Sequence, residues 1–256
     1  MNALVLTSLQ AANADPTIRA MADYLTQKLG LSVAFANAPR WQDREALFDR
    51  SDAQLAWLCG LAYAEKRYSH AAPIELLAAP VMNAPHYAGR PVYFSDVVVG
   101  ADSPLRCFAD LRGARWAYNN PGSHSGYNIT RYHLAKLGED GSFFGRVVES
   151  GSHQRSLALL LAGEIDASAI DSTVLETELL LRPELAGQVR IIERLGPSPI
   201  PPWVLRREVS PILAAEIRRC FVEMNNDPAG AALLAQAQML RFAPVTDSDY
   251  DPIRQM

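Results

Sequence analysis

The chain has 256 residues, of which 49% are hydrophobic and 20% charged, so it is long enough for one large domain or two smaller ones with buried cores. Its formal net charge of -4 comes from 24 basic and 28 acidic residues without a block of like charge, which argues against nucleic acid or an anionic membrane as a partner. No apolar stretch is long enough to insert into a membrane, and residues 1–10 lack the basic start and apolar segment of a secretion signal. As it stands the sequence predicts a cytoplasmic protein, or a periplasmic one if its start was trimmed.

The first part of the chain alternates short apolar strands with helices, which favours a parallel sheet. Ile18, Met21 and Leu25 recur at helical spacing, and the helix that they predict begins at Asp15-Pro16 and ends at Gly30. The other elements expected here are strands over 2–6, 31–35, 54–58 and 74–79, a helix over 41–48, and an unusually long strand over 90–99. A strand of that length can serve two sheets.

A second series of alternating strands and helices follows and predicts a second α/β unit. Its expected strands are 114–118, 146–149, 167–170 and 190–193, and its expected helices are 125–137, 152–161 and 172–181. The proline-rich stretch 196–202 cannot form a helix and is predicted to be a rigid crossing segment. Beyond it we expect a strand over 203–206 and helices from Ser210-Pro211 onward, near 229–237 and near 247–253.

Residues 119–127, which read NNPGSHSGY, are the most informative part of the sequence for function. They leave a predicted strand and place Ser123, His124 and Ser125 where a helix begins. The first N–H groups of a helix have no intrahelical partner and lie at the positive end of its dipole, so this loop could bind a phosphate, phosphonate or carboxylate. The alternative is that one serine is an ordinary helix cap and the rest are loop residues.

A second strand-to-helix turn, Ser150-Gly151-Ser152-His153, is predicted beside the first. Because neighbouring strands of a parallel sheet end at the same edge, the two turns would face one crevice. His153 could donate to an anion there, or it could be a solvent-exposed side chain at a helix start without a role in binding. Asp171 ends the next strand and either faces the same crevice or caps the following helix. Tyr63 and Tyr93 could bind a ligand from the first part of the chain, or could be packing residues.

Signals for catalysis are weak. The sequence contains no GxSxG, HExxH, GxxxxGK[ST] or GxGxxG motif in a suitable position. Its cysteines, Cys59, Cys107 and Cys220, are not paired as in a zinc site. We therefore expect no catalytic residues, no metal and no cofactor.

The chain resembles the phosphonate/phosphate substrate-binding proteins of ABC transporters, which have the type II periplasmic binding protein fold. The resemblance runs from about residue 55 to about residue 250. It is carried by WLCGLAY at 57–63, YFSDVVV at 93–99, DS at 102–103, DLRG at 110–113, SHSGY at 123–127, SGSH at 150–153 and IDASAIDS at 165–172.

The resemblance implies a ligand site with contacts from both halves of the chain. In the family, the hydroxyl run before the Gly-Tyr pair holds the phosphonate oxygens. The contacts that it implies here are Tyr63, Tyr93, Ser123, His124, Ser125, His153 and Asp171. Where aminoalkylphosphonate binders carry acidic residues, this chain has Thr173 and Pro202-Trp203, which disfavours an aminophosphonate ligand.

The resemblance also implies two α/β lobes, each a mixed, mostly parallel sheet flanked by helices, with the ligand in a cleft between them. Lobe 1 is predicted to span 1–94 and 203–256, lobe 2 to span 95–202, and hinges to lie near 93–96 and 200–203. The predicted function is capture of a phosphonate, phosphate or similar oxyanion for an ABC permease or for intracellular sensing.

Two alternatives remain open. The first is an enzyme on the same fold, similar to the pyrimidine synthases of thiamine biosynthesis, with His124 or His153 as the reactive group. The second is a regulatory or scaffolding module that has lost its ligand.

Overall fold

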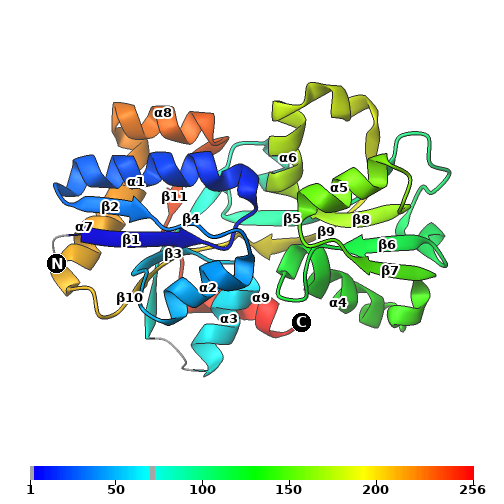
Figure 1. The fold of residues 1–256 in the computed structure, drawn as a ribbon, viewed down its shortest axis with the longest axis horizontal. Helices are drawn as coiled ribbons and strands as arrows, with labels where there is room; N and C mark the ends of the chain where they lie inside the picture. Colours follow the sequence, from blue (N-terminus) through cyan, green and yellow to red (C-terminus); the bar gives the residue numbers. More distant parts are fainter. Residues whose placement is uncertain (1–2, 70–72) are drawn as a thin grey trace. The chain divides into compact units, whose positions relative to one another are not determined.

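The computed structural model describes residues 3–69 and 73–256 (Figure 1). Two compact units make up this chain: unit 1 comprises Met1–Val92 and Pro199–Gln255, and unit 2 comprises Tyr93–Ser198 together with Met256. The chain therefore passes from one unit to the other after Val92 and back after Ser198. Both boundaries lie a few residues before those predicted from the sequence, at 94 and 202.

Unit 1 is built on a mixed six-stranded sheet with the order β11-β4-β10-β3-β1-β2. β1 runs parallel to β2 and β3, whereas β10 and β11 join antiparallel to the neighbours that they pair with. The strands are β1 (Ala3–Ser8), β2 (Ser32–Phe35), β3 (Leu55–Trp57), β4 (Ile74–Met82), β10 (Trp203–Arg206) and β11 (Met239–Ala243).

Helices cover both faces of this sheet. α1 packs against α7 and α8, and α3 packs against α9 (Figure 1). The helices are α1 (Asp15–Leu29), α2 (Trp41–Asp49), α3 (Gly60–Ser69), α7 (Pro211–Val222), α8 (Pro228–Gln236) and α9 (Asp251–Arg254). The predicted end of α1 is confirmed: Gly30 is left-handed, with φ 64°, and its N–H donates to the Thr26 carbonyl.

Unit 2 is built on a five-stranded sheet with the order β7-β6-β8-β5-β9. β6 runs parallel to β7 and β8, and β5 pairs antiparallel with β8. The strands are β5 (Val92–Gly100), β6 (Arg115–Tyr118), β7 (Arg146–Glu149), β8 (Ala167–Asp171) and β9 (Val189–Pro199). Figure 1 shows α5 (His153–Leu161) and α6 (Ser172–Leu181) on one side of this sheet and α4 (Ile129–Lys136) on the other.

An aromatic core of unit 2 lies between its sheet and α4. Phe108, Trp116, Phe143 and Phe144 are buried there and contact one another through stacked and edge-on ring pairs. Aromatic side chains bury large apolar areas, so this cluster fixes β6 firmly against α4. The most informative stretch of the sequence, residues 119–127, therefore follows a strand that is held firmly by packing.

Two expectations need correction. β11 follows α8 after a short turn and was not predicted from the sequence. Within the predicted crossing segment over 196–202 the chain does leave unit 2, after Ser198, but the first residues of the segment are also strand, because β9 continues to Pro199. β9 is the last strand in the order of its sheet, and proline is tolerated at a sheet edge because no partner strand needs its missing N–H there.

None of the helices in the described ranges is both long and apolar enough to cross a membrane.

Candidate functional site

Residues 119–127, here called the serine loop, connect β6 to the helix that packs beneath the unit 2 sheet. The helical segment begins with a wide π-type turn over His124–Asn128 and continues as α4. The turn after β7 lies directly beside this loop, since the Ser150 N–H donates to the Tyr118 carbonyl at 2.8 Å and the Gly151 N–H to the Asn119 carbonyl at 2.7 Å. The structure thus brings together the two strand-to-helix turns singled out from the sequence.

Ser123 caps the helical segment. Its Oγ accepts a hydrogen bond from the Gly126 N–H at 3.1 Å. The expectation that one serine of the loop is an ordinary helix cap is therefore confirmed for Ser123. The cap uses the hydroxyl oxygen as an acceptor, so it does not consume the hydroxyl hydrogen, which can still be donated to a ligand.

Ser125 lies two residues after Ser123, within the turn, and is buried. Its carbonyl accepts a hydrogen bond from the Ser95 hydroxyl of β5, which ties the loop to the long strand. Its own Oγ lies 3.2 Å from Nε2 of His153, the first residue of α5. Two predicted ligand contacts, Ser125 and His153, are therefore direct neighbours.

The His153 imidazole is buried and neutral. Burial lowers its pKa to about 4, and the backbone of Ala169 opposes this only in part. Its Nδ1 makes no hydrogen bond of good geometry among the described residues, although that backbone lies close enough to act on it. Its Nε2 lies 3.3 Å from the amide Nδ2 of Asn119 as well as near Ser125.

Gly126 lets these groups pack tightly. A Cβ at this position would lie 2.0 Å from Asn119 Oδ1, 2.7 Å from Asn119 Cγ and 3.1 Å from His153 Cε1. The first two distances are shorter than real Cβ contacts in proteins, so only glycine leaves room for the Asn119 amide. The glycine of the loop's Ser-Gly-Tyr sequence thus has a steric reason in this structure.

His124 is almost fully buried, and its hydrogen-bond partners differ from those of the Ser125–His153 pair. Its Nε2 lies 2.9 Å from Ser198 Oγ, and its Nδ1 lies 3.4 Å from Nδ2 of Asn128. Burial lowers its pKa to about 4, so the ring is neutral near pH 7. Both nitrogens have partners within unit 2, and a contact between the His124 side chain and an anion stays a prediction.

Tyr93 and Asp171 lie on neighbouring strands of the same unit. The buried ring of Tyr93 is centred 6.3 Å from that of His124. Asp171 pairs with Ser95 across β8 and β5, and its Oδ1 accepts from the Thr173 N–H at 2.9 Å and from Thr173 Oγ1 at 2.7 Å, capping α6. Burial raises the pKa of Asp171 to about 6. The capping role is thus present, while the ligand roles of both residues stay predictions.

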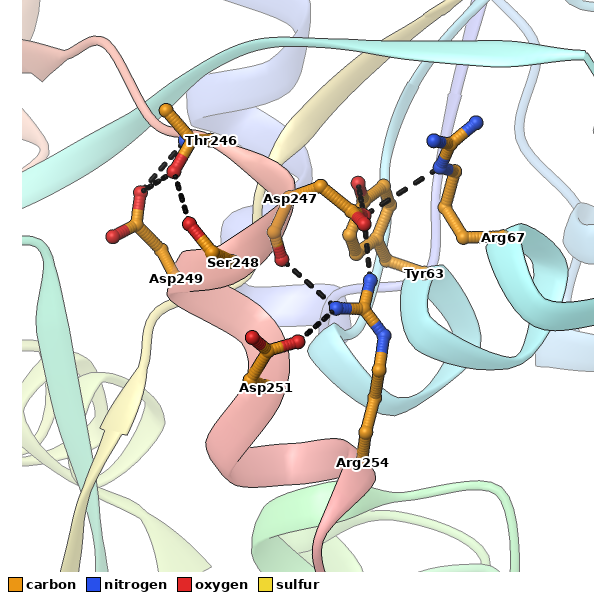
Figure 2. Close-up of polar contacts among 8 residues, drawn as sticks. All are labelled: Tyr63, Arg67, Thr246, Asp247, Ser248, Asp249, Asp251 and Arg254. Atoms are coloured by element: carbon orange, nitrogen blue, oxygen red, sulfur yellow. Dashed lines mark hydrogen bonds and ion pairs between the residues drawn. The ribbon is translucent and has the colours of Figure 1, made fainter.

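Tyr63 belongs to unit 1, in the first turn of α3, where it is buried against Tyr250. Its hydroxyl donates to Asp247 Oδ1 at 2.5 Å (Figure 2). The same carboxylate oxygen forms ion pairs with Arg254 at 2.5 Å and with Arg67 at 3.5 Å. Burial and the Asp247 carboxylate raise the pKa of Tyr63. Its one hydroxyl hydrogen is therefore committed to Asp247, and a ligand contact through Tyr63 stays a prediction.

The polar side chains gathered at the serine loop are neutral hydrogen-bonding groups. They are the hydroxyls of Ser123 and Ser125, the Asn119 amide and, from α5, the His153 imidazole. A helix start adds backbone N–H groups and the positive end of the dipole. Such a set can hold an oxyanion through dipoles. Over residues 3–69 and 73–256, no three His, Cys, Asp or Glu side chains gather closely enough to hold a metal ion.

Three residues with a clear part in this arrangement were missed from the sequence. Asn119 lies at the same strand end as the serines, a position that could have marked it as a candidate. Ser95 lies within a strand and Ser198 within the proline-rich stretch, and neither position carries a local signal. Their partners are distant in sequence, so only the sheet order reveals them.

The family described as "ABC transporter, phosphonate, periplasmic substrate-binding protein" matches residues 4–250 of the chain. The phosphonates-binding periplasmic protein of Escherichia coli (strain K12) is 27% identical over 173 residues, which cover 66% of this chain and 51% of that protein. The chain thus matches only about half the length of that relative.

Two solved structures are similar over almost the whole chain. PhnD1 from Prochlorococcus marinus (MIT 9301), in complex with methylphosphonate, has a TM-score of 0.87 at 18% identity and covers 99% of this chain and 96% of its own. A binding protein component of an ABC phosphonate transporter from Pseudomonas aeruginosa has a TM-score of 0.85 at 23% identity, with coverage of 99% and 84%. At these identities the likeness establishes the fold, and the predicted type II periplasmic binding protein fold is confirmed.

Proposed function

Because the chain belongs to the family of periplasmic substrate-binding proteins of phosphonate ABC transporters, we propose that its serine loop binds a phosphonate or a closely related oxyanion such as phosphate. The observation that carries the proposal is the meeting of the Ser125 hydroxyl with His153 at the start of the helical segment that Ser123 caps. The donors there are aimed by β6, β7 and the first turn of α5. They form one small polar cluster within unit 2.

The family consists of transport proteins that bind a substrate, not of enzymes, so the alternative of an enzyme on the same fold is not supported. The two histidines that it would have used are both buried, and the pKa of each is lowered to about 4. General acid–base catalysis near neutral pH works best with a pKa close to the working pH. Neutral, hydrogen-bonded imidazoles suit the holding of a ligand better than the transfer of its protons.

The choice of ligand class follows the relatives. The Prochlorococcus marinus protein is in complex with methylphosphonate, and the Escherichia coli relative is named for phosphonates. Tetrahedral oxyanions of this size accept several hydrogen bonds at once, and hydroxyl and backbone N–H donors at a helix start match that need. Methylphosphonate is therefore the first ligand to test, with phosphate as the second.

Thermal unfolding against a ligand panel tests the proposal. Methylphosphonate, phosphite, phosphate, aminoethylphosphonate, sulfate and phosphorylated metabolites are compared by the shift of Tm, and affinities are then measured by titration calorimetry. A ligand at a hundred times its Kd stabilises the native state by about 2.7 kcal/mol, which gives a clear shift. We expect methylphosphonate or phosphate to give this shift.

The matched variants are Ser125→Ala and Ser142→Ala. Ser125 lies in the proposed site, whereas Ser142 is an exposed serine elsewhere in unit 2. The first substitution should sharply reduce the ligand-induced shift and the second should leave it intact. Absence of a shift for every oxyanion in the wild-type protein would overturn the proposal.

We further propose that the ligand is delivered to an ABC permease, since the family is named for its part in such transporters. Stimulation of the ATPase of a candidate permease in liposomes, dependent on both this protein and its ligand, would support delivery. Ligand binding without stimulation of any co-encoded permease would favour the sensing role instead. The compartment stays a prediction, which fractionation of cells expressing the full gene would test.

A further inference from the structure

Asn119 has no part in the family resemblance, yet it lies at the centre of the serine loop. It follows β6 directly and is more than nine-tenths buried. Its Nδ2 lies 3.3 Å from His153 Nε2, and its Oδ1 has no hydrogen-bond partner among the described residues. The close approach of Gly126 holds the amide in place from the other side.

Two groups compete for a single atom at this point. Nε2 of His153 has the Asn119 amide at 3.3 Å and the Ser125 hydroxyl at 3.2 Å. A neutral imidazole nitrogen carries either one lone pair or one N–H, in the plane of the ring, and so makes one good hydrogen bond. Only one of the two neighbours, the Asn119 amide or the Ser125 hydroxyl, can therefore make a good hydrogen bond to this nitrogen, and the other is free to bind a different group.

We propose that Asn119 is a positioning residue for oxyanion binding: it occupies Nε2 of His153 and thereby leaves the Ser125 hydroxyl hydrogen for the bound ligand. With Nδ2 as the donor, Nε2 carries the lone pair and the proton of the ring is on Nδ1. The inference rests on the proposed function, since it assigns a role at the same site.

Without the Asn119 side chain, Ser125 becomes the only close partner of the lone pair on Nε2. Ser125 would donate to the imidazole in the ligand-free protein, and an incoming anion would have to break this bond and leave a buried nitrogen unsatisfied. Unsatisfied buried groups are costly, so affinity should fall. We expect Asn119→Ala to raise the Kd for methylphosphonate about tenfold.

A double-mutant cycle with Ser125→Ala tests whether Asn119 acts through Ser125. If it does, Asn119→Ala weakens methylphosphonate binding in the wild-type background but adds little once Ser125 is alanine, so the two effects are not additive. Asn225→Ala is the control, because Asn225 is an exposed amide of unit 1 whose Nδ2 donates to Asn226 Oδ1. It should change the Kd less than about twofold. Additive effects of Asn119 and Ser125, or no effect of Asn119→Ala, would overturn the inference.

The ¹⁵N chemical shift of His153 Nε2 gives a readout that needs no ligand. In the ligand-free protein, Asn119→Ala should move this shift, because the partner of Nε2 changes, whereas Ser125→Ala should leave it nearly unchanged. The reverse pattern would show that Ser125 already holds the nitrogen and that the assignment is wrong. If the wild-type protein binds no oxyanion but the shifts behave as expected, the proposed function fails while the arrangement of Asn119, His153 and Ser125 stands.

Discussion

The His124 imidazole joins the serine loop to the end of unit 2: its Nε2 lies 2.9 Å from Oγ of Ser198, the residue after which the chain enters unit 1. Asn128 donates to the other nitrogen at 3.4 Å, so Nδ1 accepts and Nε2 carries the proton that is donated to Ser198. The His124 side chain is thus a bridge inside unit 2. Its neutral form is an integral part of the folded structure.

This bridge predicts a pH dependence of stability. Burial lowers the pKa of His124 from 6.5 to about 4, so between these values the unfolded chain binds a proton that the native protein does not. The contribution of neutral His124 to the free energy of unfolding is therefore complete above the unfolded-state pKa of 6.5, and it is lost as the pH falls towards the native-state pKa of about 4. We expect wild-type stability, relative to His124→Gln, to fall by up to about 1.4 kcal/mol per pH unit in urea unfolding.

Comparison with the variant isolates His124 from other groups that titrate in the same range. His153 gives a slope of the same sign, since its pKa is also lowered to about 4, whereas Asp96 and Asp171, each raised to about 6, give slopes of the opposite sign. Parallel curves for wild type and variant would show that His124 is not buried in its neutral form.

Gly126→Ala should disrupt the serine loop, because the new methyl group would lie 2.0 Å from Asn119 Oδ1. Forcing an atom into a packed site costs roughly 1–3 kcal/mol of stability. Displacement of Asn119 and His153 should also abolish oxyanion binding. Gly187→Ala is the control, since a Cβ there meets nothing within 4 Å, and chemical unfolding and calorimetry of both variants check the expectation. Equal effects of the two substitutions would contradict it.

Asp171→Asn should stabilise the protein at neutral pH. Burial raises the pKa of Asp171 from 3.8 to about 6, so the side chain, held protonated in the native protein, contributes stability that is complete below the lower value and is lost as the pH rises through the upper one. Asparagine carries no charge and its carbonyl oxygen can still accept from Thr173. We expect a gain on the order of 1–3 kcal/mol above the raised pKa, which disappears in acid.

The same variant tests the predicted ligand contact of Asp171. Removal of a negative charge from unit 2 should strengthen oxyanion binding if Asp171 only caps α6. A marked loss of affinity in titration calorimetry would instead indicate that the carboxylate accepts a hydrogen bond from the ligand.

Tyr63→Phe should destabilise unit 1 by about 1–2 kcal/mol, because Asp247 loses a buried donor. Burial alone would raise the pKa of Asp247, but the Tyr63 hydroxyl and Arg254 outweigh it and hold the pKa below its usual value. The variant should therefore also lose part of its pH dependence in acid. Ser248→Ala, which removes only an exposed contact with Thr246, should change stability by less than about 0.5 kcal/mol. Equal stability of Tyr63→Phe and Ser248→Ala would refute the structural role of the Tyr63–Asp247 hydrogen bond. The ligand affinity of Tyr63→Phe, measured by calorimetry, tests the predicted contact between Tyr63 and the ligand.

Much of the secondary structure could be predicted from the sequence, because its signals are local. The helix from Asp15 to Leu29 is marked by apolar spacing, a proline in its first turn and a left-handed glycine after its end. Ser123, Ser152 and Asp171 could all be placed at helix starts for the same reason, and each is a cap in the structure. Strand β11 escaped prediction because five residues after a helix contain too little of the alternating pattern.

The sequence by itself determined the two α/β units, the family and the positions of the serines and histidines at strand ends, because periodicity, caps and motifs involve residues close together in the chain. Only the tertiary structure decided what each of those side chains touches. His124 meets Ser198, 74 positions away, and Asn119 meets His153, 34 positions away, because the strand order β7-β6-β8-β5-β9 brings those segments together. Hydrogen bonds at such separations depend on sheet order and register, which no local pattern encodes.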